Sequence, residues 1–73
     1  MQANKMKVTK EDVVQIKPGE QKIFVCDSPL AARNGQALVL NYVKKYFLPE
    51  GVENFKTNIE GNVLFVTAIA IKN

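Results

Sequence analysis

Positions 62–71, near the end of the chain, lie in the longest stretch without a charged residue. It is rich in β-branched and aromatic residues and too short to cross a membrane, which predicts the central strand of a small sheet. Its odd positions carry the bulkier apolar side chains and its even positions smaller ones: Val63, Phe65, Ile69 and Ile71 against Leu64, Val66, Ala68 and Ala70. Because both faces of this strand are apolar, both faces of the sheet should need cover.

Two short segments come first in the chain. Thr9 followed by Glu11 and Asp12 has the pattern of a helix N-cap with an acidic first turn. This favours a short helical turn within residues 10–16, with a strand as the alternative. Pro18-Gly19 then predicts a type II turn in which the glycine takes a positive φ. Residues 21–26 alternate as a strand with two partly apolar faces.

Residues 29–47 predict one long helix. Ser28 can cap its first turn, Pro29 suits the first helical position, and Pro49 forces its end. Gly35 suggests a close approach of the helix to the sheet. A period of 3.6 residues places one stripe towards the core: Ala32, Gln36, Val39, Val43, Tyr46 and Phe47, flanked by Leu38, Leu40 and Tyr42.

Residues 54–59 alternate cleanly and predict an edge strand with one wet face. Residues 60–62 join it to the last strand as a hairpin, and the loop length decides which faces match. A loop of three residues aligns Phe55 with the odd side of the last strand, and a two-residue turn aligns it with the even side. We favour the longer loop, with Gly61 left-handed, because it gathers the largest side chains under the helix.

These elements predict an α+β fold. It has a three-stranded sheet in the spatial order second, third, first, and one long helix on one face. This is a split β-α-β-like arrangement with a possible short N-terminal helix. We expect residues 1–8 to be a flexible arm and residues 9–73 to form a single small domain.

The expected register leaves an apolar patch on the sheet face away from the helix, formed by Phe24, Leu64, Val66 and Ala68. This patch is the candidate partner interface. Residues 13–16 folding back, or a second copy of the chain, are the alternatives for its cover. We expect partial cover by residues 13–16, with a protein partner or weak self-association at the remainder.

Ten Lys and Arg against seven Asp and Glu give a formal charge of +3, which permits an anionic partner without requiring one. The polar face of the long helix carries Arg33, Asn41, Lys44 and Lys45. These residues are the candidate site for the alternative function, weak nucleic-acid binding with little sequence preference. A solvated helix surface is the simpler interpretation of the same charges.

The chain has no histidine and one cysteine, Cys26, so we expect no disulfide, no metal site and no cofactor. Cys26 just before a capped helix is the best candidate nucleophile, but without a histidine base we interpret it as a structural thiol. We interpret Ser28 as an N-cap. Since positions 1–10 lack an apolar stretch, we expect a cytoplasmic protein that does not enter membranes. Because no catalytic signature is present, we also expect it to be non-enzymatic.

The strand-helix-hairpin order, with Lys17-Pro18-Gly19-Glu20 leading into the first strand, resembles small uncharacterised proteins carried on bacterial mobile elements and prophages. The resemblance spans most of the chain after Lys10 and implies no catalytic residue. It implies an accessory role beside DNA or a protein complex. The apolar sheet face predicts a protein-interaction or homodimerisation module, and the basic helix face and N-terminal arm support auxiliary nucleic-acid binding as the alternative.

Overall fold

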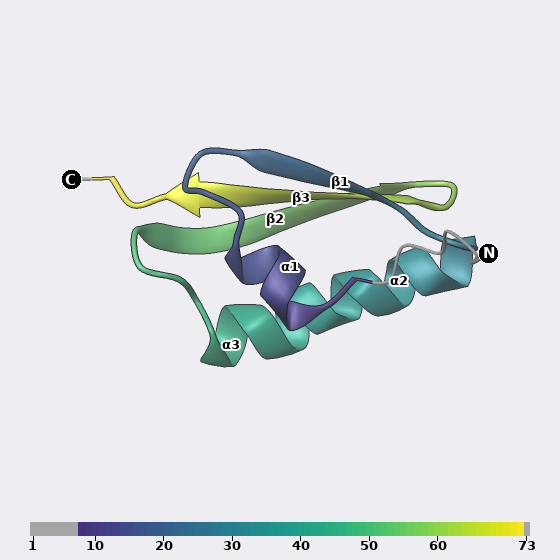
Figure 1. Cartoon of the computed structure of the whole chain (residues 1–73), viewed down its shortest axis with the longest axis horizontal. Helices are drawn as coiled ribbons and strands as arrows, with labels where there is room; N and C mark the ends of the chain where they lie inside the picture. Colours follow the sequence, from purple (N-terminus) through teal and green to yellow (C-terminus); the bar gives the residue numbers. More distant parts are fainter. Residues whose placement is uncertain (1–7, 73) are drawn as a thin grey trace.

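The computed structural model describes residues 8–72, which form a three-stranded sheet with helices on one side (Figure 1). Strand β3 pairs antiparallel with both neighbours, which gives the order β1-β3-β2. The predicted α+β class, strand order and long helix are confirmed. The elements in chain order are α1 (Lys10–Val14), β1 (Gln21–Val25), α2 (Pro29–Leu38), η1 (Val39–Val43), α3 (Lys44–Tyr46), β2 (Val52–Glu60) and β3 (Val63–Ala70).

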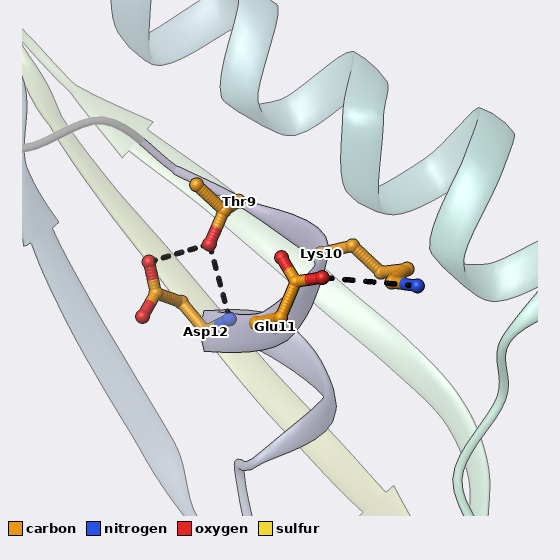
Figure 2. Close-up of polar contacts among 4 residues, drawn as sticks. All are labelled: Thr9, Lys10, Glu11 and Asp12. Atoms are coloured by element: carbon orange, nitrogen blue, oxygen red, sulfur yellow. Dashed lines mark hydrogen bonds and ion pairs between the residues drawn. The ribbon is translucent and has the colours of Figure 1, made fainter.

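Helix α1 is the short N-terminal helix that the sequence favoured. Oγ1 of Thr9 accepts a hydrogen bond from the backbone N of Asp12 (3.2 Å) and donates one to Oδ2 of Asp12 (2.8 Å), as Figure 2 shows. The ion pair between Lys10 and Glu11 (3.8 Å) is partly exposed and adds little stability. Of the expected arm, residues 1–7 lie outside the described residues. Val8 packs against the core instead.

Helix α1 lies on the same side of the sheet as the long helix and packs against η1 (Figure 1). The expectation that residues 13–16 would partly cover the opposite face is therefore wrong. One helix about 10 Å wide cannot cover three strands spaced about 4.8 Å apart. A second element is therefore needed on the same face of the sheet. Buried Val13 and Ile16 complete that layer.

The long helix is continuous from Pro29 to Tyr46, but η1 is a turn of π-helix. Before and within this turn the core stripe is as predicted, with Ala32, Val39 and Val43 fully buried. One extra residue in the turn rotates the following side chains by about 100° around the axis. Tyr46 and Phe47 therefore leave the core, which corrects the predicted end of the stripe.

The β2–β3 hairpin decides which side of the sheet meets the helices. Glu60 pairs directly with Val63, so the turn contains two residues, Gly61 and Asn62. Gly61 has a φ of 63° and Asn62 a negative φ, signs that fit a type II′ turn. The three-residue loop was the wrong choice. Because side chains alternate along a strand, this difference of one residue exchanges the two faces of β3.

As a consequence, the predicted interface residues Phe24, Leu64, Val66 and Ala68 lie under the helices, each 1% exposed or less. Across the strands there, Phe24 pairs with Leu64 and Phe55 with the small Ala68. We expected the odd positions of β3 to supply the largest core side chains. Phe24 of β1 and Phe55 of β2 supply them instead. Asn62 also fits the shorter turn, because its Nδ2 donates a 2.7 Å hydrogen bond to the carbonyl of Cys26.

Candidate functional site

The sheet has one face without a helix, which we call the open face. The strand registers assign residues to this face, because directly paired residues point to the same side of the sheet and side chains alternate along each strand. Within residues 8–72, no helix lies over this face (Figure 1). It is formed by Gln21, Ile23 and Val25 of β1, by Val63, Phe65, Thr67 and Ile69 of β3, and by Asn54, Lys56, Asn58 and Glu60 of β2.

The open face is apolar along β1 and β3. Ile23 is 51% exposed and Val25 is 56% exposed, although both lie in the middle or at the end of a paired strand. Their neighbours on β3 are Phe65 and Val63, which are half-buried. These four side chains form one continuous apolar surface.

The β2 side of the open face is polar, and its charges cancel. Lys56 and Glu60 carry opposite charges and are both exposed. Between this polar margin and the apolar residues lies a shallow hollow of about 350 Å³. Thr67 lies among its lining residues, and its Oγ1 accepts a 3.1 Å hydrogen bond from Nε2 of Gln21. A surface that is half apolar and electrically neutral suits a protein partner better than a phosphate backbone.

The candidate nucleic-acid-binding residues on the outer helix face are all exposed: the basic Arg33, Lys44 and Lys45 and the polar Asn41. They do not form one cluster. Arg33 and Lys44 are eleven positions apart, which at ~1.5 Å per residue separates them by about 16 Å along the axis. Only the group around the end of the helix, from Asn41 to Lys45, is compact.

An aromatic cluster lies beside this group, although the helical period predicts a core position for its rings. The Tyr42 ring packs edge to face on Phe47, with 4.9 Å between centroids, and on Tyr46, at 6.1 Å. Nζ of Lys10 lies 4.3 Å from the centre of the Phe47 ring. Tyr46 is 67% exposed. The amino-acid sequence contains no pattern that predicts the π-turn, which brings these rings to the surface.

Cys26 is buried directly after β1, with Sγ 3.8 Å from the carbonyl oxygen of Phe24. Burial raises the pKa of this thiol, which lowers the fraction of the reactive thiolate at neutral pH. Ser28 caps α2, since its Oγ accepts a 3.1 Å hydrogen bond from the backbone N of Ala31. Cys26 therefore lies in the core, and Ser28 is the N-cap of α2.

Among the described residues, no three His, Cys, Asp or Glu side chains lie close enough together to hold a metal ion. In the same part of the chain, no helix has the length and apolar character needed to cross a membrane. Comparison with protein-family models, curated proteins and solved structures found no match to this chain. Function must therefore be inferred from the surfaces of the chain itself.

Proposed function

We propose that this chain is a cytoplasmic, non-enzymatic interaction module that self-associates through the open face of its sheet. The observation that carries the proposal is the exposure of Ile23 and Val25 next to Phe65 and Val63. Scattered apolar residues are normal on a protein surface, but a contiguous apolar sheet face is typical of an interface. The module can also serve as an accessory subunit of a larger complex.

The energetic argument rests on the size of the domain. Covering each 100 Å² of apolar surface gains about 2.5 kcal/mol. A domain this small has a total stability of only about 5 kcal/mol. Removing even part of the open face from water therefore changes the stability of the chain substantially.

A second copy is the partner that best fits the charge of this face. Lys56 and Glu60 balance each other, so no strongly charged partner is required. The sheet is about 14 Å wide and, at eight residues in β3, about 27 Å long. Its outline of about 400 Å² is well below the ~800 Å² that each partner contributes to a standard interface. The association should therefore be weak and concentration-dependent.

Sedimentation equilibrium over a wide concentration range tests this function. We expect the wild-type chain to pass from monomer to dimer as its concentration rises, and Val25→Lys to remain monomeric. Leu30→Lys is the matched control, because Leu30 is 66% exposed but lies on α2. It should associate like the wild type. A wild-type chain that stays monomeric throughout, or equal behaviour of the two variants, would overturn the proposal.

A second function is favoured by a different surface. The exposed Tyr42 and Tyr46 rings lie on the same helix end as Lys45, and aromatic rings interleaved with cations are typical of single-strand nucleic-acid sites. The resemblance to proteins of mobile elements favours the same role. We propose that any such binding is weak, sequence-tolerant and strongly dependent on salt, because few cations are present to displace counterions.

Fluorescence anisotropy with a labelled single-stranded oligonucleotide tests this second function. Replacing Arg33, Lys44 and Lys45 together by Ala should abolish binding, and Tyr46→Ala should weaken it by at least about fivefold through lost stacking. Lys56→Ala, on the open face, is the control and should have little effect. Binding that persists in the triple variant or at high salt would exclude this surface.

A further inference from the structure

The strand registers order the open face into rows that run across the sheet. The central row contains Ile23, Phe65 and Asn58. The row on one side contains Gln21, Thr67 and Lys56, and the row on the other side contains Val25, Val63 and Glu60. Each outer row thus ends on β2 with a single charge, and the two charges are opposite.

We propose that two copies of the chain pack open face to open face about a two-fold axis along the central row. This inference rests on the proposed self-association and specifies its geometry. A rotation about that axis exchanges the two outer rows, so Lys56 of each copy faces Glu60 of the other. Two identical ion pairs then close the β2 margin of the interface, as an isologous contact requires.

The distribution of apolar and polar side chains over the strands favours this axis over an axis parallel to the strands. With the axis along the central row, β1 lies over β1 and β2 over β2, so Ile23 and Phe65 of one copy meet the same residues of the other, and neither charge of β2 is covered by an apolar side chain. With the axis along β3, Ile23 and Val25 of β1 would cover Asn58 and Glu60 of the second copy's β2. That arrangement would remove a charge from water without an opposite charge beside it, which is costly.

The hollow on the open face fits the same arrangement. Thr67 lies among its lining residues, and the two-fold axis places Val63 of the second copy over Thr67. An apolar side chain of the second copy therefore lies over this hollow. Stacked sheets usually cross at about 30°, which offsets facing rows near the margin by a few ångströms. Lys and Glu side chains are long and flexible enough to span that offset.

The ion pairs can form only between copies. Lys56 and Glu60 lie four residues apart on one strand, which is about 13 Å at ~3.3 Å per residue. That separation is too large for an ion pair within the chain. A gain of association from pairing these two residues would therefore report on the dimer alone.

The test is a charge exchange between two exposed positions. Lys56→Glu alone and Glu60→Lys alone should each weaken self-association, because each dimer would contain two like-charged contacts. An equimolar mixture of the two variants restores both pairs in the mixed dimer. Sedimentation equilibrium should show the mixture associating about tenfold more tightly than either variant alone. The double variant Lys56→Glu/Glu60→Lys should associate like the wild type.

Two results would overturn this geometry, and they are distinguishable. A wild-type dimer whose charge variants associate no better when mixed would exclude this two-fold axis and leave the open face as the interface. A wild-type chain that is monomeric at all concentrations would refute self-association itself. High salt should narrow the difference between the mixture and the single variants, because these exposed pairs are screened.

Discussion

Gly35 of α2 lies so close to Leu64 of β3 that a Cβ added at position 35 would be 3.0 Å from Cδ2 of Leu64. It would also lie 2.8 Å from Cγ2 of Val8. Both distances are shorter than ordinary van der Waals contact. The glycine therefore allows the long helix to approach the central strand, as the sequence had suggested.

We predict that Gly35→Ala destabilises the chain although alanine is the better helix former. Helix propensity favours the change by up to about 1 kcal/mol, whereas overpacking of a filled core costs about 1–3 kcal/mol. Urea denaturation should show a net loss of about 1 kcal/mol. Asn34→Ala, on the exposed neighbouring position, is the control and should be neutral or slightly stabilising. Equal stability of the two variants would mean that the helix does not approach the sheet this closely.

The faces of the sheet can be tested by placing one lysine on either side. Val66 is fully buried and Ile23 is 51% exposed. Val66→Lys should unfold the chain, because a charge without a partner in the core costs several kcal/mol. Ile23→Lys should retain the native circular dichroism spectrum and a cooperative unfolding transition. A folded Val66→Lys chain would show that the two faces of β3 are assigned the wrong way round.

Cys26 should make the stability of the chain depend on alkaline pH. Burial raises the pKa of its thiol in the folded state, so above the unfolded pKa of about 8.5 the unfolded chain releases this proton first. The contribution of Cys26 is fully present below that pH and is lost as pH rises towards the folded pKa. The free energy of unfolding should therefore fall more steeply with pH in the wild type than in Cys26→Ala. Parallel curves for the two chains would contradict the buried position of the thiol.

Much of the fold follows from local signals in the sequence. Thr9 and Ser28 are N-caps in the structure, and Gly19 has the positive φ of 86° that its turn required. These residues act through contacts within a few positions of the chain, which is why the sequence alone located the elements. The strand order followed from the connections between them.

The candidate site was not predictable in the same way. Which side of β3 meets the helices depends on one residue in the Gly61–Asn62 turn, and both sides of that strand are apolar. The hydrophobic pattern therefore fitted either register. The exposed Tyr46 depends on the π-turn, for which the sequence has no recognisable residue pattern. Both errors arise because the hydrophobic pattern fixes neither the length of a hairpin turn nor the position of a π-turn.

The most direct measurement of the central claim is a methyl NMR dilution series over roughly a hundredfold range of concentration. If the open face mediates self-association, the methyl signals of Ile23, Val25, Val63 and Ile69 should shift together with concentration, while those of buried Leu64 and Val66 should change much less. Concentration-independent signals for all of these methyl groups, or shifts confined to Leu30 on the helix, would contradict the claim.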